Sequence, residues 1–316
     1  MSFEANTPAA AWAGEKERSS LWMLRLMRWI ALNAGRRRAR VVLHPVTLYF
    51  LLTGGVVRRE SARYLSRALG RRARLRDIYR HIHCFAATIL DRVYLLQESY
   101  GEFELRPNGI EAMDDALARG KGVLMIGAHI GSFEVLRALG VGRGVRVAAV
   151  MYEDNARLMN ATLAALAPKT PLHTIALGRV DAMLSLRHWL DSGGIAGLLG
   201  DRTLPFSSLR TRTLCLPFLG APARFSDGPF RIAAMLRRPV IFMAGLYHGG
   251  HRYELRFMPL ADFTNVNATN RDSMIRGAME RYVATIESLC REAPYNWFNF
   301  YDFWAAGANP MLGRVD

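Results

Sequence analysis

Residues 122–140 read GVLMIGAHIGSFEVLRALG and contain the clearest secondary-structure signal of the chain. Its first half is a near-continuous apolar run that ends at the small residues Gly127 and Ala128, which is typical of a strand buried on both faces of a sheet. Its second half, FEVLRALG, is typical of a helix. The stretch therefore predicts a strand that runs directly into a helix, with His129 at the carboxyl end of the strand and Glu134 in the first turns of the helix.

The same alternation continues along the chain on the C-terminal side of this stretch. Further apolar strand candidates are VRVAAVMY, LHTIAL, GIAGLLGDRTL, PVIFMAGLY and YELRFMPL, with helical segments between most of them. This pattern predicts an α/β layered domain with a central, mostly parallel (mixed) sheet flanked by helices. We expect this domain over residues 101–316, preceded over residues 1–100 by an N-terminal basic helical region that associates with a membrane.

The positive charge of the chain is concentrated in that N-terminal region. The 316 residues include 42 Lys and Arg against 27 Asp and Glu, a net charge of +15. Between Lys16 and Arg80 there are 17 basic and 3 acidic residues, so nearly all of the excess lies there. Such a segment suits either nucleic acid or anionic lipid. The apolar residues and tryptophans between the arginines of SLWMLRLMRWIAL, residues 20–32, favour an anionic membrane and argue against nucleic acid.

A second apolar segment, VVLHPVTLYFLLTGGVV, occupies residues 41–57. It is slightly short for a transmembrane helix, and it contains Pro45 and a Gly–Gly pair. We interpret residues 20–57 as a membrane-associated hairpin or re-entrant element, with a true span and a buried core helix as the alternatives. Residues 60–98 read as further helix.

The composition excludes several classes of protein and of site. Apolar residues make up 51% of the chain and charged residues 22%, which excludes a mainly disordered chain. Three cysteines without a CxxC pair argue against a disulfide framework and a zinc site. We expect no metal and no cofactor. The N-terminus does not read as a secretory signal, so we expect the protein on the cytoplasmic side.

The junction after the first strand carries the chemistry. Side chains at the carboxyl ends of strands in an open α/β sheet face the crevice where ligands bind. A carboxylate at Glu134 can fold back, hold one nitrogen of His129 and leave the other nitrogen free as a base. The small residues Gly131 and Ser132 let the backbone and a substrate approach closely. Asp154 follows a later strand on the same rim, where it is a candidate for acceptor binding, with a solvated loop as the alternative.

GVLMIGAHIGSFEVLRALG resembles the first motif of the lysophospholipid acyltransferase superfamily, and most of all its branch of bacterial lipid A lauroyl/myristoyl acyltransferases, where a histidine and an acidic residue form an H-x4-D/E pattern. The resemblance extends over about residues 20–304. It implies that His129 is the general base that removes a proton from an acceptor hydroxyl or amine, and that Glu134 orients His129. The acceptor then attacks an acyl thioester without a covalent enzyme intermediate.

The resemblance also implies the substrates and the location. By this resemblance we expect the donor to be acyl carrier protein, or alternatively a coenzyme A thioester, and the acceptor to be a lipid or glycolipid. We likewise expect the protein at the cytoplasmic face of the bacterial inner membrane, bound peripherally or by a single N-terminal anchor. In GLLGDRTL, residues 197–204, Asp201 and Arg202 occupy the place of the family's motif for substrate anions. We expect Arg202 to bind a phosphate oxygen bidentately, with a local Asp–Arg salt bridge as the alternative.

The C-terminal end departs from the family pattern. Family members often end with a tryptophan followed by a His–Arg pair, whereas APYNWFNFYDFW keeps Trp297 and has Asn299 to Tyr301 in place of the basic pair. This argues against lipid A itself as the acceptor. The aromatic residues of this segment line an acyl channel, meet the bilayer, or pack on the core. The competing function is a non-catalytic adaptor on the membrane surface that binds anionic lipid.

Overall fold

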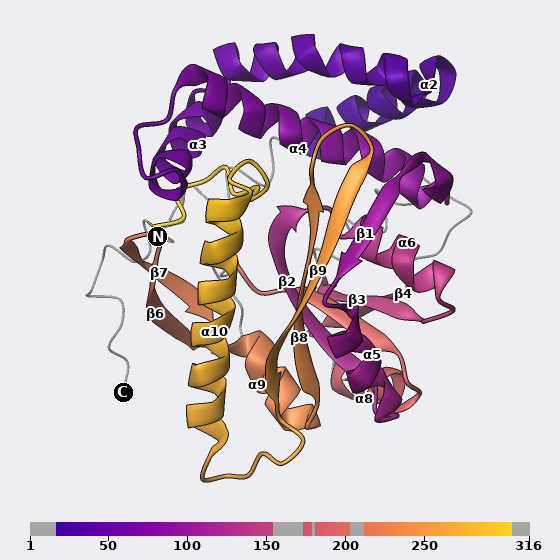
Figure 1. The fold of residues 1–316 in the computed structure, drawn as a ribbon, viewed down its shortest axis with the longest axis vertical. Helices are drawn as coiled ribbons and strands as arrows, with labels where there is room; N and C mark the ends of the chain where they lie inside the picture. The colour runs from indigo at the N-terminus through magenta and orange to yellow at the C-terminus, as the bar shows by residue number, and fades with distance from the viewer. Residues whose placement is uncertain (1–16, 154–172, 179–180, 203–211, 305–316) are drawn as a thin grey trace, which may run out of the picture.

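The computed structural model describes residues 17–153, 173–178, 181–202 and 212–304. Its centre is one seven-stranded sheet (Figure 1), whose strands are β1 (Glu104–Asn108), β2 (Val123–Gly131), β3 (Val147–Tyr152), β4 (His173–Leu177), β5 (Ile195–Leu199), β8 (Pro239–Tyr247) and β9 (Arg252–Asp262). The strand order is β1-β9-β8-β2-β5-β3-β4. All neighbours pair in parallel except β8 and β9, so the mostly parallel mixed sheet predicted from the sequence is confirmed.

Helices pack on both faces of this sheet, and the alternation of side chains along β2 separates the two faces. Leu124 and Ile126 belong to one core cluster, together with residues of α9 (Gly228–Leu236) and α10 (Arg271–Glu292). Val123 and Met125 belong to the other cluster, together with residues of α4 (Leu75–Leu96), α5 (Ile110–Ala118) and α6 (Glu134–Gly142). Odd-numbered residues of β2 therefore face the side that α4 and α6 cover.

Two smaller elements complete the α/β part of the chain. The strands β6 (Thr213–Phe218) and β7 (Ala221–Ser226) form a separate antiparallel hairpin. Helix α8 (Ala182–Asp191) contacts β4 and β5 near one edge of the main sheet.

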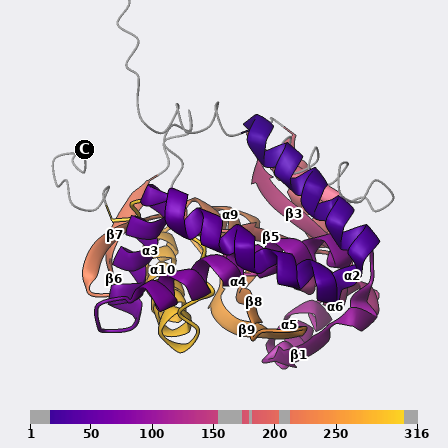
Figure 2. The same ribbon diagram turned by 90° about the horizontal axis from the view of Figure 1, so that it is seen from above.

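The N-terminal region is helical, as predicted, and lies across one end of the sheet (Figures 1 and 2). It consists of α2 (Glu17–Thr53), α3 (Gly55–Ala68) and α4. Helix α2 is broken at Gly35, whose φ of 74° lies in the left-handed region. Beyond this break, Ala39, Leu43 and Thr47 are buried at four-residue spacing, and α2 packs along α4.

The other side of α2 and the start of α3 expose apolar side chains. Because residues 36–53 of α2 are buried on one side and exposed on the other, this part of the helix is not a fully buried core helix. No single helix of the described residues is long and apolar enough to cross a membrane; Gly35–Thr53 and Gly55–Ala68 meet the length and composition requirement only as a pair bent by 94°. The exposed apolar residues here are Val41, Val42, Leu48, Tyr49, Leu52 and Val56.

A buried ion pair joins α2 to α4. Arg36 donates from Nε and Nη2 to the two carboxylate oxygens of Asp91, at 2.9 and 3.0 Å. Asp91 has no exposed surface and also accepts a hydrogen bond from the hydroxyl of Tyr253, at 2.9 Å. Burial raises the pKa of Asp91 above its ordinary value, although the charges of Arg36 and Arg40 act in the opposite direction. The position of α2 over α4 is thus fixed by charge as well as by packing.

Candidate active site

Two neighbouring parallel strands bring His129 and Asp201 together. In the β2–β5 pair Gly127 lies opposite Leu199, and two residues further along the same register His129 comes beside Asp201. Nδ1 of His129 lies 2.7 Å from Oδ1 of Asp201, and the backbone N–H of His129 donates to Oδ2 at 3.1 Å. A carboxylate only accepts hydrogen bonds, so Nδ1 carries the proton, and in the neutral imidazole Nε2 has the free lone pair.

Asp201 is completely buried, and its second oxygen is held by two more donors. Nε1 of Trp297 and Nδ2 of Asn299 donate to Oδ2 at 3.0 and 3.1 Å. Burial by itself raises the pKa of Asp201, but the charge and hydrogen bonds of His129 and the charge of Arg202 outweigh it and hold the pKa below its ordinary range. The carboxylate is therefore ionised at neutral pH, where it fixes the imidazole tautomer.

The segment that follows α10 carries these donors to the site. Ile130 and Trp297 form an antiparallel bridge, and the N–H of Phe298 donates to the carbonyl of His129 at 2.7 Å. From the sequence, Trp297 was identified only as a residue that the family pattern retains, and Asn299 only as a departure from that pattern. Of the three alternatives for this aromatic segment, packing on the core applies to Trp297, Phe303 and Trp304, which are buried, while the buried Phe298 also lines the pocket described below.

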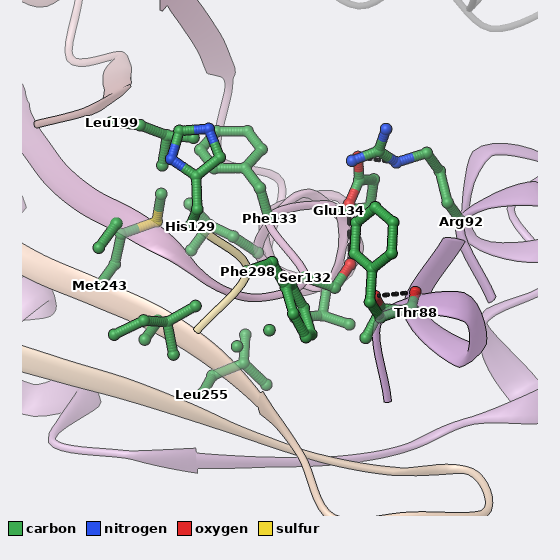
Figure 3. Close-up of a pocket in the computed structure, with 18 of the residues that line it drawn as sticks. Thr88, Arg92, His129, Ser132, Phe133, Glu134, Leu199, Met243, Leu255 and Phe298 are labelled. Carbon is green, nitrogen blue, oxygen red and sulfur yellow. Dashed lines mark hydrogen bonds and ion pairs between the residues drawn. The ribbon is translucent and has the colours of Figure 1, made fainter. Parts of the chain in front are cut away.

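Glu134 occupies a different place from the one expected. It is the first residue of α6, and its Oε1 lies 2.6 Å from Nε of Arg92 on α4, while its Oε2 accepts a hydrogen bond from Ser132 Oγ at 2.8 Å. Figure 3 shows Glu134 beside Arg92, apart from the ring of His129. The carboxylate on Nδ1 of His129 is that of Asp201, because strand register places it there. The expectation that Glu134 binds a nitrogen of the His129 imidazole was therefore wrong.

Gly131 lets two strands approach closely. Its φ is +64°, and a Cβ at this position would lie 1.8 Å from the carbonyl oxygen of Gly245 on β8. The pairing of β2 with β8 is irregular between Gly127 and Gly131. A side chain at Gly131 would therefore separate β8 from the strand that carries His129. The remaining candidate, Asp154, lies outside the described residues.

Arg202 also lines the site, but the C-terminal segment already accepts hydrogen bonds from two of its three guanidinium nitrogens. Nε donates to Oδ1 of Asn299 at 2.9 Å, and Nη2 donates to the carbonyl of Phe298 at 3.0 Å. The guanidinium also lies over the ring of Tyr301, 5.7 Å from its centroid. Among the described residues, these contacts leave Nη1 of Arg202 without a partner.

His129, Ser132, Glu134 and Arg202 line one pocket beside α4 (Figure 3). Its wall from α4 consists of Phe85, Thr88, Ile89 and Arg92, which share one helix face at i, i+3, i+4 and i+7 spacing. A mainly apolar pocket with a few convergent polar groups is the usual form of a site for an apolar ligand. Among the described residues, no group of three or more His, Cys, Asp and Glu side chains could hold a metal ion. Other apolar lining residues are Phe133, Leu199, Met243, Leu255, Phe257 and Phe298.

Comparison with known protein families gives a match. The model of the family described as bacterial lipid A biosynthesis acyltransferase matches residues 86–305, which is more than half of the chain. The matched range includes His129, Glu134, Asp201 and the C-terminal segment that binds Asp201. No curated protein matches the chain.

Proposed function

Because the chain belongs to the family of bacterial lipid A biosynthesis acyltransferases, and is accordingly an acyltransferase that acts on lipid, we propose that His129 is its general base. We propose that it moves an acyl chain from acyl carrier protein to a hydroxyl or amine of a lipid or glycolipid, with a coenzyme A thioester as the alternative donor. One observation carries this proposal: the hydrogen bond from Nδ1 of His129 to the buried carboxylate of Asp201, at the wall of an apolar pocket.

The reaction needs one general base and one carboxylate that stabilises the protonated form of that base. Nε2 of His129 takes the proton of the acceptor O–H or N–H as the acceptor atom attacks the thioester carbonyl. The tetrahedral intermediate then collapses, the carbon–sulfur bond breaks, and the imidazolium returns its proton to the leaving thiolate. Asp201 stabilises the imidazolium between these two steps and is not itself protonated. No acyl group is attached to the protein at any stage.

The pocket gives the acyl chain an apolar environment next to this base. Leu255 and Phe257 of β9 and Met243 of β8 line it from the sheet, and Phe85 and Ile89 line it from α4. Burial of methylene groups among such side chains is favourable by about 0.8 kcal/mol per group. The thioester carbon is then close to His129 while the chain is out of water. Gly131, Ser132 and Nη1 of Arg202 are the proposed neighbours of the reacting groups.

The charge of the protein supports a carrier protein as the donor. Acyl carrier proteins are acidic, and a net charge of +15 attracts an acidic partner from a distance. Salt screens charges at separations beyond about 8 Å at physiological ionic strength, so the association rate is expected to fall as salt is added.

We also propose that α2 and the start of α3 bind the cytoplasmic face of the bacterial inner membrane. Their exposed apolar side chains, above all Val41 at 68% and Leu52 at 66% exposure, are flanked by arginines at both ends of the segment. An apolar face flanked by basic side chains suits the headgroup region of an anionic bilayer. Binding is then peripheral or through this one N-terminal element.

The decisive experiment is acyl transfer in vitro. Labelled lauroyl–acyl carrier protein and lauroyl–coenzyme A are each incubated with a total bacterial lipid extract and purified protein. We expect a labelled lipid from the wild type, and about 10² to 10⁴-fold less from His129→Ala at equal folded concentration. His251→Ala, at an exposed histidine outside the pocket, is the matched control and is expected to retain full activity.

The competing function gives the opposite result. A non-catalytic adaptor that binds anionic lipid would transfer no label from either thioester, and His129→Ala would leave its biological activity intact. Equal transfer by the wild type and by His129→Ala would instead support the acyltransferase function and exclude His129 as its general base.

A further inference from the structure

Arg92 is a charged group of the pocket to which the acyl transfer described above assigns no part. Among the described residues its one partner is Glu134, which contacts Nε of Arg92. The Arg92 side chain is 26% exposed, so its outer part is open to the pocket and to water. The two terminal nitrogens, Nη1 and Nη2, therefore have no acceptor within the described part of the protein.

Glu134 holds this guanidinium in one orientation. Both of its carboxylate oxygens are engaged, one by Arg92 and one by the hydroxyl of Ser132. It is almost completely buried, and as the first residue of α6 it lies where the helix dipole favours a negative charge. The contact with Glu134 is an ion pair at Nε, and no described acceptor binds Nη1 or Nη2. Figure 3 shows this arrangement at the side of the pocket away from His129.

Arg92 and Arg202 differ in how many of their N–H donors are already bound. Arg202 uses Nε and Nη2 for Asn299 and for the carbonyl of Phe298. Arg92 forms only an ion pair at Nε among the described residues, so both of its terminal N–H groups remain available as a fork. Two parallel N–H donors of an arginine match two oxygens of one phosphate, and such pairs are among the strongest hydrogen bonds in proteins.

We propose that Arg92 binds a phosphate group of a substrate and that Glu134 is the positioning residue that aims Arg92 at it. This inference rests on the proposed function, since the acyl transfer supplies two sources of that chemistry. One is the phosphodiester of the phosphopantetheine arm on the donor. The other is a phosphate of the lipid acceptor. In either case Glu134 acts through Arg92 and not through His129.

The test measures binding with probes that cannot react. Calorimetry in detergent micelles compares S-dodecyl-4′-phosphopantetheine with S-dodecyl-pantetheine, and dilauroyl phosphatidic acid with dilauroylglycerol. Each pair differs only in its phosphate. We expect Arg92→Gln to weaken the phosphorylated member of one pair by about 10- to 100-fold and to leave the other member unchanged. The affected pair identifies the source of the phosphate as donor or acceptor.

Two further variants control for folding. Arg92→Lys keeps the charge without the fork and is expected to recover part of the lost affinity. Arg143→Gln removes an arginine whose Nη2 binds both oxygens of the exposed Asp114 carboxylate outside the pocket, and is expected to change neither probe. Equal weakening of both members of each pair by Arg92→Gln, or no weakening of any, would overturn the proposal.

Glu134→Gln separates the two possible roles of the carboxylate. We expect it to weaken the same phosphorylated probe as Arg92→Gln, to raise KM for the phosphorylated substrate, and to leave the pH profile of kcat unchanged. A shifted pH profile with unchanged phosphate affinity would assign Glu134 to His129 instead. The binding arm needs no turnover, so phosphate-selective binding in a protein that transfers no acyl chain would refute the proposed function and leave this inference standing.

Discussion

The indole nitrogen of Trp297 lies 3.0 Å from Oδ2 of Asp201, although the two residues are separated by 96 positions in the sequence. Asp201 in turn binds His129, 72 positions before it. The orientation of the imidazole thus depends on β2, on the end of β5 and on the segment after α10. A substitution in any of these three parts is therefore expected to change the orientation of the imidazole, even where the substituted residue does not contact His129.

Asp201→Asn is expected to reduce kcat by about 10³- to 10⁴-fold. An amide of the same size can present its NH2 to Nδ1, which moves the imidazole proton to Nε2 and removes the free lone pair from the pocket. Transfer of a labelled acyl chain measures the effect. Asp114→Asn, on an exposed carboxylate paired with Arg143, is the control and is expected to keep wild-type activity. Activity of Asp201→Asn within a few fold of wild type would show that the imidazole needs no carboxylate.

The fold is expected to lose stability in mild acid because of His81. Nε2 of this buried histidine donates to the carbonyl of Trp297 and Nδ1 accepts from the hydroxyl of Ser61, both at 2.8 Å. Burial lowers the pKa of His81 from 6.5 to about 4, despite the opposing hydrogen bond to Trp297. Between these values the unfolded chain binds a proton that the folded protein does not, so the free energy of unfolding falls as pH drops, by up to about 3 kcal/mol.

Urea unfolding at pH 7.5, 6 and 5 checks this sign and its origin. His81→Gln is expected to be less stable than wild type at pH 7.5, and to lose less additional stability on acidification. His251→Gln, at an exposed position, is expected to follow the wild-type dependence. A His81→Gln variant with the same dependence on pH as the wild type would mean that other groups cause the acid sensitivity.

Asp91→Ala is expected to destabilise the protein by about 3–5 kcal/mol, because it leaves Arg36 buried without its carboxylate. Replacing both partners, as in Arg36→Met with Asp91→Leu, is expected to recover part of this loss, since no uncompensated charge remains at the pair itself. Denaturant unfolding of Arg36→Met, of Asp91→Leu and of the double variant gives the coupling between the two positions. Additive losses would show that the ion pair does not join α2 to α4.

Leu52→Glu and Val41→Glu are expected to weaken binding to vesicles of phosphatidylglycerol and phosphatidylcholine by about tenfold each, because each places a charge on an exposed apolar side of α2. Leu184→Glu is the matched control: Leu184 is 60% exposed on α8, at the other end of the molecule (Figure 1). Sedimentation with vesicles measures the bound fraction. An equal loss of vesicle binding in all three variants would exclude α2 as the element that contacts the membrane.

The sequence predicted the mixed α/β sheet and the position of His129, because a long apolar run followed by glycines and a helix is a local signal. It assigned the wrong carboxylate to the imidazole. Spacing along the chain favoured Glu134, five residues away, whereas the partner belongs to the neighbouring strand β5. Strand order is set by packing of the whole domain and leaves no mark in the local pattern.

The C-terminal segment illustrates the same limit. Asn299 donates to Asp201 and accepts from Arg202, yet in the sequence it stood only where relatives often carry a basic residue. Its contacts exist because residues 296–298 pair with the end of β2. The division of the chain near residue 100 stays a prediction; α4, which precedes it, shares a core cluster with β2 and β9.

Asp91 and Arg92 are consecutive residues of α4, and consecutive residues of an α-helix point about 100° apart. One binds α2 and the other lines the pocket. No hinge therefore separates the helix proposed to touch the bilayer from the wall of the pocket. A molecule attached through α2 presents its pocket at one fixed angle to the surface. Its turnover is then expected to follow the number of substrate molecules per unit area of lipid, and to fall when inert lipid dilutes them at constant bulk concentration.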